Sequence, residues 1–199
     1  EKIIQLKNFY DLFKNKFLFD IFKLIFPEFI YIERVKKIQK LLKIKDIVVD
    51  RSLIFASMLL DSSNNHQYFF HKYNVSNEIK NNLNLYSRIL KEIKLDEDFF
   101  SKNLKKNIFF YGKEQIKKVF LVYNVVNKKT LSPKTEEILS KINHALIPKF
   151  PVTGNDLLKQ GVQSGEKVGE ILKKIEKKWI ENNFKINHEE IKKLVKQNT

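Results

Sequence analysis

Cysteine is absent from this chain, and several kinds of chemistry are excluded with it. Without a thiol there is no disulfide, no cysteine-ligated zinc site and no cysteine nucleophile. The absence fits a reducing compartment, where disulfides rarely persist. Since no signal-peptide pattern opens the chain either, we expect a cytoplasmic protein.

Glycine and proline are also scarce, with five and four residues among 199. Both interrupt helices, so their rarity permits long helical stretches. Apolar residues recur at spacings of three and four, and no segment alternates as a half-buried strand does. The sequence therefore predicts an all-α fold, a multi-helix bundle with a helical tail.

A long uncharged apolar run is missing as well. The most apolar window, Lys16–Phe26, is interrupted by Asp20 and Lys23, so no membrane-spanning helix is expected. The chain opens on Glu1 without an initiator methionine, which leads us to expect a piece of a longer protein.

Positive charge is abundant. Thirty-eight Lys and Arg residues against 23 Asp and Glu residues leave a net charge of +15. Such an excess indicates an anionic partner, either nucleic acid or an acidic membrane surface. A compositional bias toward Lys, Ile, Asn and Phe would produce the same charge, so charge alone does not choose between these interpretations.

Apolar spacing and capping residues locate several helices. Between Ile3 and Ile25 a first pair of short helices is expected, with one apolar stripe through Leu6, Tyr10, Phe13 and Phe17. The segment 50–61 is apolar nearly all round, which predicts a helix at the centre of the bundle.

A linker is expected within 127–137, before a helix that has Ser132 as N-cap and Pro133 as its first residue. This linker suggests a division of the chain into a helical body, residues 1–127, and a helical tail, residues 128–199.

Four of the five glycines lie in the tail, at 154, 161, 165 and 169. Thr153 and Asp156 have capping-box spacing, and Gly161 is suited to a left-handed helix end. Ser164 is expected to cap a second helix whose stripe is Val168, Ile171, Leu172, Ile175 and Trp179. Gly169 beside that stripe would let another helix approach closely. The prediction is a glycine-capped helix hairpin.

This hairpin could grip a polynucleotide backbone. Gly154 and Gly165 each lie near a helix N-terminus, where exposed N–H groups can bind phosphate oxygens. Lys167 and several later lysines accompany them. The alternative is that the glycines only permit tight turns and close packing.

The stretch from Phe150 to Phe184 resembles the C-terminal tail of bacterial tRNA nucleotidyltransferases (CCA-adding enzymes) and the related poly(A) polymerases. That tail has the pattern P-x-x-G-x-D-L, then G-hydrophobic, G and I/V-G-x-x-L. The matching positions are Pro151, Gly154, Asp156, Leu157, Gly161, Val162, Gly165, Val168, Gly169 and Leu172. Looser likeness extends upstream over Leu24–Phe29, Asn74–Leu85 and Phe110–Tyr123.

The resemblance implies a body and tail that bind the tRNA elbow and acceptor stem through the sugar-phosphate backbone, as suits helical RNA. RNA, most of all tRNA, is therefore the expected partner. The candidate RNA-binding residues are Thr153, Gly154, Asn155, Gly161, Ser164, Gly165, Lys167, Lys173, Lys174 and Lys177. CCA addition and poly(A) addition are not distinguished.

The catalytic head of that family does not match this chain. The head has a Gly-Ser turn for the triphosphate and an Asp-x-Asp pair for two magnesium ions. Magnesium and nucleoside triphosphate are therefore expected only with a catalytic half, which would precede this segment, be encoded separately or be lost.

The other candidate sites in this chain point to structural roles. No Gly-Ser turn precedes the Asp-x-Asp at Asp96–Asp98, where Asp96 is interpreted as a helix N-cap. His66 and His71 are spaced wrongly for one helix face, His144 suits a packed or rim position, and His188 lies near the N-cap of the last helix. No catalytic or metal-ligating residue is predicted. Trp179 is expected in the core, with base stacking as the alternative.

Two other functions stay open. The aromatic, lysine-flanked segment Phe9–Phe26 would suit a basic protein that lies on anionic membranes. A helical remnant without function is the third interpretation.

Overall fold

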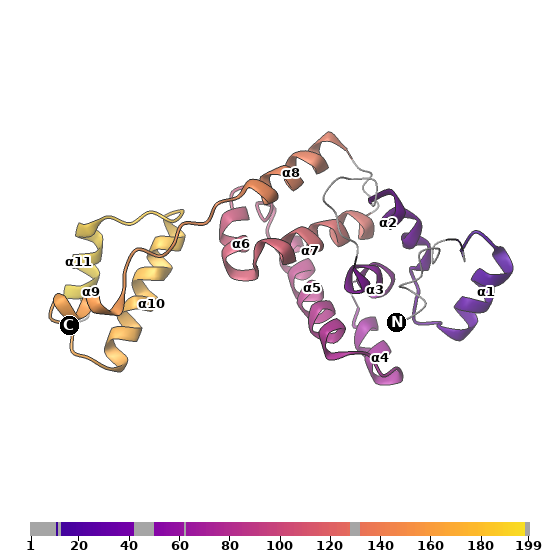
Figure 1. Cartoon of the computed structure of the whole chain (residues 1–199), viewed down its shortest axis with the longest axis horizontal. Helices are drawn as coiled ribbons and strands as arrows, with labels where there is room; N and C mark the ends of the chain where they lie inside the picture. Colours follow the sequence, from indigo (N-terminus) through magenta and orange to yellow (C-terminus); the bar gives the residue numbers. More distant parts are fainter. Residues whose placement is uncertain (1–10, 12, 42–49, 62, 128–131, 198–199) are drawn as a thin grey trace.

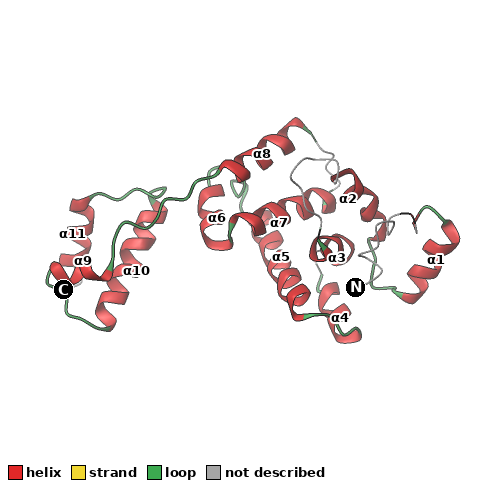
Figure 2. Cartoon of the chain, in the orientation of Figure 1, coloured by secondary structure: helices red, strands yellow, loops and turns green. Residues whose placement is uncertain are grey.

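The computed structural model describes residues 11, 13–41, 50–61, 63–127 and 132–197. These residues form helices joined by turns and loops, with no strand among them (Figures 1 and 2), so the predicted all-α class is confirmed. No helix in these ranges is both long and apolar enough to cross a membrane. The helices described are α1 (Lys16–Ile25), η3 (Ile32–Arg34, a 3-10 helix), α2 (Val35–Leu41), α3 (Arg51–Leu59), α4 (Asn65–Lys72), α5 (Asn77–Leu95), α6 (Leu104–Tyr111), α7 (Lys113–Val126), α8 (Pro133–His144), α9 (Gly154–Lys159), α10 (Glu166–Glu181) and α11 (His188–Lys196).

Short polar side chains cap several helix N-termini, where the first backbone N–H groups have no partner within the helix. Asp50 Oδ1 accepts from the backbone N–H of Leu53 at 2.9 Å at the start of α3. Ser132 accepts from the N–H of Thr135 at 3.3 Å, and Pro133 is the first residue of α8. The predicted cap at Ser132 is therefore confirmed.

The central helix of the body is α3. Eight of its nine residues are buried, from Ser52 to Leu59, as its all-round apolar sequence predicts. Figure 1 shows α3 end-on, with α2, α5 and α7 around it. The same core takes in Leu139 and Ile142 of α8.

Helix α1 differs from its predicted stripe. Phe13, just before the helix, is buried, but Phe17 is 71% exposed, so the prediction of one buried row is wrong at Phe17. Leu6 and Tyr10 lie outside the described residues. The helix is apolar over more than half of its circumference, so its sequence does not specify the buried side. Packing between aromatic rings determines which side faces the core. The ring of Phe22 lies 5.4 Å from that of Phe13 and 5.6 Å from that of Phe29.

The C-terminal helices α9, α10 and α11 form a second core, joined to α8 by an extended segment (Figure 1). Its buried residues are Val152, Leu157, Val162, Ile171, Ile175, Ile191 and Val195. An aromatic cluster connects these three helices, called the tail from here on, to the body that includes α8. Phe109 of α6 lies 5.9 Å from Trp179 and 5.8 Å from Phe184, ring centre to ring centre. The division into domains at residues 127 and 128 stays a prediction.

Candidate nucleic-acid interface

The first turn of α9 contains three predicted contact residues. Thr153 is the N-cap, and Gly154 and Asn155 are the first two helical residues. The predicted capping box is present, because Asp156 Oδ2 accepts from Thr153 N at 2.8 Å and from Thr153 Oγ1 at 2.7 Å. These hydrogen bonds lower the pKa of Asp156, so its carboxylate is charged at neutral pH. The N-terminus of α9 already has a negative group beside it, which makes it a weaker phosphate site than the sequence suggested.

The turn between α9 and α10 contains Gly161, Ser164 and Gly165. Gly161 has φ +88° just after α9, as expected of a glycine that ends a helix. The N-cap of α10 is Gly165, with φ +116°, and Ser164 lies one residue earlier in the exposed turn. The prediction of Ser164 as N-cap is therefore wrong. The chain enters α10 through a conformation that side-chain-bearing residues rarely adopt, so glycine takes the cap position.

The inner side of α10 is the predicted apolar stripe. Ile171, Ile175 and Trp179 are buried, and Val168 and Leu172 pack partly against the same cores. Trp179 is 2% exposed and its ring lies 4.9 Å from that of Phe184. Its side chain is part of the aromatic cluster and is not accessible to a base.

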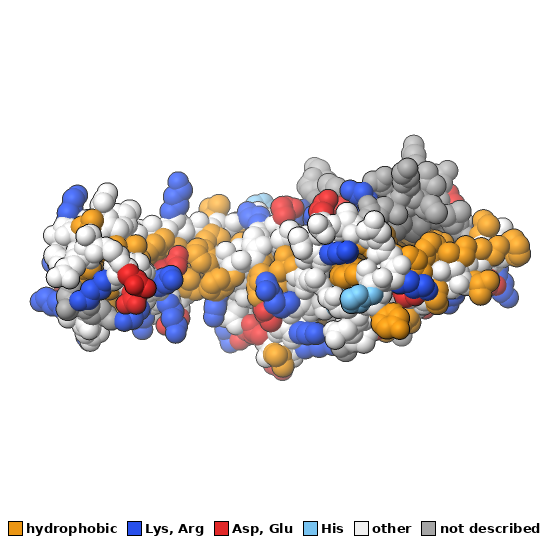
Figure 3. Space-filling view, turned by 90° about the horizontal axis from the view of Figure 1, so that it is seen from below, with side chains coloured by type: hydrophobic (Ala, Val, Ile, Leu, Met, Phe, Trp, Pro, Cys, Tyr) orange, Lys and Arg blue, Asp and Glu red, His pale blue; other side chains and the backbone are white. Residues whose placement is uncertain are grey.

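The polar side of α10 presents the predicted lysines. Lys167, Lys173, Lys174 and Lys177 are all exposed, and so is the neighbouring Lys178. Four glutamates share this helix, at 166, 170, 176 and 181, so its positive excess is a single charge. Figure 3 shows lysine and arginine side chains spread along both the tail and the body on the face seen from below.

Gly169 does not have its predicted role. A Cβ built on Gly169 would meet no atom within 4 Å among the described residues, and the residue is exposed. None of the described helices approaches it closely, because the residue turns away from the apolar stripe of α10.

A cationic groove lies where the tail meets the body, and the sequence did not predict it. It has a volume of about 590 Å³ and lies between the start of α6, the end of α8 and the turn after α10. The side chains that line it include Lys102, Lys105, Lys141, His144, Leu146 and Asn183. Lys102 and Lys105 belong to the lysine-rich run 101–106 (SKNLKK), which can be recognised in the sequence. Only folding brings α8 and Asn183 beside this run.

The charge of this groove follows from where its acidic neighbours lie. Lys102 pairs with Asp98 at 3.0 Å, and Lys141 pairs with Glu137, four residues before it on α8. No Asp or Glu is among the residues that line the groove itself. His144, at the end of α8, is exposed with Nδ1 2.9 Å from the backbone oxygen of Ser140, in agreement with a rim position. The groove is therefore lined by three lysines and no carboxylate, and two of these lysines also form ion pairs with carboxylates just outside it.

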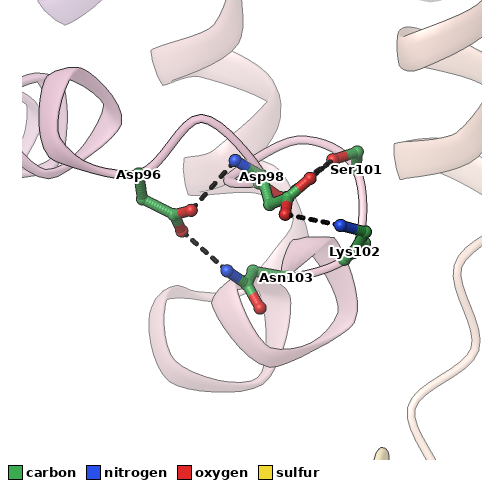
Figure 4. Close-up of polar contacts among 5 residues, drawn as sticks. All are labelled: Asp96, Asp98, Ser101, Lys102 and Asn103. Carbon is green, nitrogen blue, oxygen red and sulfur yellow. Dashed lines mark hydrogen bonds and ion pairs between the residues drawn. The ribbon is translucent and has the colours of Figure 1, made fainter.

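The Asp96–Asp98 motif forms a self-contained turn (Figure 4). Asp96 accepts from the N–H of Asp98 at 3.0 Å and from the side-chain amide of Asn103 at 2.9 Å. Asp98 accepts from Ser101 Oγ at 2.8 Å and from Lys102 Nζ at 3.0 Å. Asp96 is the C-cap of α5, and α6 begins only at Leu104, so its interpretation as an N-cap is wrong. Both carboxylates stabilise the α5–α6 connection, which does not fit a two-magnesium site.

The histidines do not form a metal site in the part of the chain that the structure describes. No group of three His, Asp or Glu side chains there could hold a metal ion. His66 is buried in α4, and His71 is exposed near the end of the same helix. His188 is the first residue of α11, directly after the N-cap Asn187, which confirms its predicted position near that cap.

A protein-family model matches most of this chain, and known relatives match a shorter part of it. Residues 50–195 match the family model of tRNA nucleotidyltransferase domain 2. Relatives named CCA tRNA nucleotidyltransferase 1, mitochondrial, are 27% identical over 60 residues in Mus musculus, 28% over 60 in Homo sapiens and 31% over 61 in Danio rerio.

Each of these alignments covers 30–31% of this chain and 14% of the relative, so the match spans a small part of the relatives' length. No solved structure matches the chain. Because the family model covers residues 50–195 of 199, the chain belongs to the tRNA nucleotidyltransferase domain 2 family.

Proposed function

We propose that this chain is the RNA-binding part of a tRNA nucleotidyltransferase and holds tRNA by its sugar-phosphate backbone. The observation that carries the proposal is the cationic groove between body and tail in a chain of this family. Lysines in a groove that no carboxylate lines suit the phosphates of a nucleic-acid backbone, and backbone contacts suit helical RNA, whose deep major groove hides the base edges.

The α10 lysines extend the same surface. Lys177 and Lys178 lie in the last turns of α10, close in sequence to Asn183 at the groove. The glutamates of α10 leave that helix with little excess charge, so we assign the larger share of binding to Lys102, Lys105 and Lys141. Lys167, Lys173 and Lys174 stay proposed as secondary phosphate contacts.

Nucleotide addition is proposed to require a catalytic half with its own magnesium and nucleoside triphosphate. The Asp-x-Asp motif of this chain is occupied by donors of its own turn, so it does not supply the metal-binding carboxylates. The names of the three relatives support CCA addition over poly(A) addition as the reaction that this part serves. A cytoplasmic location remains a prediction.

Binding to a full tRNA, titrated at several salt concentrations beside a duplex DNA of similar length, tests the proposal. We expect tRNA to bind more tightly than DNA, with an affinity that falls steeply as salt rises. Changing Lys102, Lys105 and Lys141 together to Gln should weaken binding and reduce the salt slope by about 0.9 for each phosphate that the variant no longer neutralises. The triple change of Lys167, Lys173 and Lys174 to Gln should have the same effect to a smaller extent.

A matched control removes three charges from the other end of the molecule, with Lys14, Lys16 and Lys23 changed to Gln (Figure 1). Its tRNA affinity should stay that of the unchanged chain. Equal weakening of the control and the groove variant, or equal affinity for tRNA and DNA, would contradict the proposal.

The exposed face of α1 favours membrane binding as a second candidate function. Phe17 is 71% exposed, Leu24 83% and Ile25 55%, and they share one side of the helix. Figure 3 shows hydrophobic side chains gathered at the α1 end of the molecule. Co-sedimentation with vesicles that contain phosphatidylserine tests it: changing Phe17 and Leu24 to Ser should abolish binding if this face inserts. No sedimentation of the unchanged chain would exclude this function.

A further inference from the structure

A second pocket lies in the body, on elements separate from the tail. It has a volume of about 270 Å³ and lies between η3, Asp61 just beyond α3, the last turns of α5 and the end of α7. It is lined by Tyr31, Arg34, Asp61, Leu90, Lys91, Lys94, Tyr123, Val126 and Asn127. Three cations and one carboxylate leave two excess positive charges around a space larger than an inorganic ion needs.

One wall of this pocket is held in place by hydrogen bonds and stacking. The guanidinium of Arg34 lies 3.7 Å from the ring centre of Tyr31 and donates to the backbone oxygen of Leu60 at 2.9 Å. Tyr31 Oη donates to Asp61 Oδ2 at 2.8 Å, and Asp61 also accepts from Ser63. These contacts fix the positions of Arg34 and Tyr31 before any ligand enters, which lowers the entropy cost of binding.

The carboxylate in this wall is held by hydrogen bonds from its neighbours. Burial raises the pKa of Asp61, but the hydrogen bonds from Ser63 and Tyr31 outweigh burial, so the pKa is lowered and the group is ionised at neutral pH. Because its oxygens accept from Tyr31 and Ser63, Asp61 is held in the wall, and its charge is counted against the three cations.

The rest of the lining combines exposed cations with apolar surface. Lys91 and Lys94 are exposed on α5, one turn apart, so both ammonium groups can reach one anionic group. Leu90 is buried beneath them, and Tyr123 and Val126 come from the end of α7. Cations beside an aromatic and apolar surface suit a ligand that has a phosphate at one end and a planar ring at the other.

We propose that this pocket binds a nucleoside monophosphate group, with its phosphate on Lys91 and Lys94 and its base against the wall formed by Tyr31 and Arg34. The group is either a free nucleotide or an unstacked nucleotide of an RNA strand. The site is separate from the groove between body and tail, so it stands whether or not that groove binds tRNA.

Calorimetric titration of the full chain with AMP tests this inference, with adenosine and inorganic phosphate as partial ligands. AMP should bind saturably and at least about tenfold more tightly than either part. Changing Lys91 and Lys94 to Gln should weaken AMP about tenfold or more, as expected when a charge-assisted hydrogen bond is removed. Changing both lysines to Arg should keep the binding, which separates a charge effect from a folding defect.

The matched control changes Lys192 and Lys193 of α11, both exposed and outside the pocket, to Gln. Unchanged AMP affinity in this control supports the site. AMP that fails to saturate, or that weakens equally in both charge variants, overturns it.

A tetra-adenylate distinguishes the source of the nucleotide. If it competes with AMP and binds more tightly, the pocket takes a nucleotide of an RNA strand; if it does not compete, the ligand is a free nucleotide. The variant with Lys102, Lys105 and Lys141 changed to Gln should retain AMP binding. A wrong proposal for the groove can therefore be told apart from a wrong proposal for the pocket.

Discussion

Replacing Trp179 with Ala is the sharpest test of how the tail is attached to the body. The side chain is 2% exposed, and its ring lies within 6 Å, centre to centre, of the rings of Phe109, Phe150 and Phe184. Truncating a buried Trp to Ala costs about 3–5 kcal/mol, because less apolar surface is buried and a cavity is left. Each aromatic pair adds about 0.5–1.5 kcal/mol beyond buried area, so we expect the upper part of that range.

Urea unfolding followed by circular dichroism at 222 nm measures this cost. Fluorescence cannot compare the two proteins, since Trp179 is the chain's one tryptophan. Phe17→Ala is the control, because Phe17 is 71% exposed and its truncation should change the free energy of unfolding by less than about 0.5 kcal/mol. A Trp179→Ala variant as stable as that control would refute the packing role and favour base stacking instead.

Two further predictions concern the tail glycines and the buried histidine. Gly165→Ala should lower the free energy of unfolding by about 1–3 kcal/mol, because φ +116° strains a residue with a Cβ. Gly169→Ala should raise the free energy of unfolding by about 0.5–1 kcal/mol, because this position is helical, exposed and open. Urea unfolding measures both variants. Equal changes in the two would contradict the different roles given to Gly165 and Gly169. Burial, and then the charge of Lys91, lower the pKa of His66, so the unfolded chain binds more protons and stability should fall as pH drops through 6.5. The midpoint of thermal unfolding should therefore change less with pH in His66→Gln than in the unchanged chain. Identical profiles would exclude His66 as the cause of the loss of stability at low pH.

Local patterns in the sequence predicted features that depend on a few neighbouring residues. The caps at Ser132 and Thr153, the left-handed residue Gly161 and the buried helix around Leu53–Leu59 are all present. Each depends on hydrogen bonds or apolar spacing within one or two turns, so the chain alone contains the information.

The predictions were wrong where a local sequence pattern was compatible with two different structures. Ser164 and Gly165 both suit an N-cap, and the choice depended on the path by which the chain leaves α9. Helix α1 is apolar on most sides, so only its packing on Phe13 and Phe29 determines that Phe17 faces outward.

The sequence by itself determined the all-α class, the family and most helix ends. Tertiary structure alone decided which cations lie together. Lys102, Lys141 and Asn183 come from three distant segments, and so do Arg34, Lys91 and Tyr123. A surface of this kind depends on how helices pack, and spacing along the chain does not encode which faces meet.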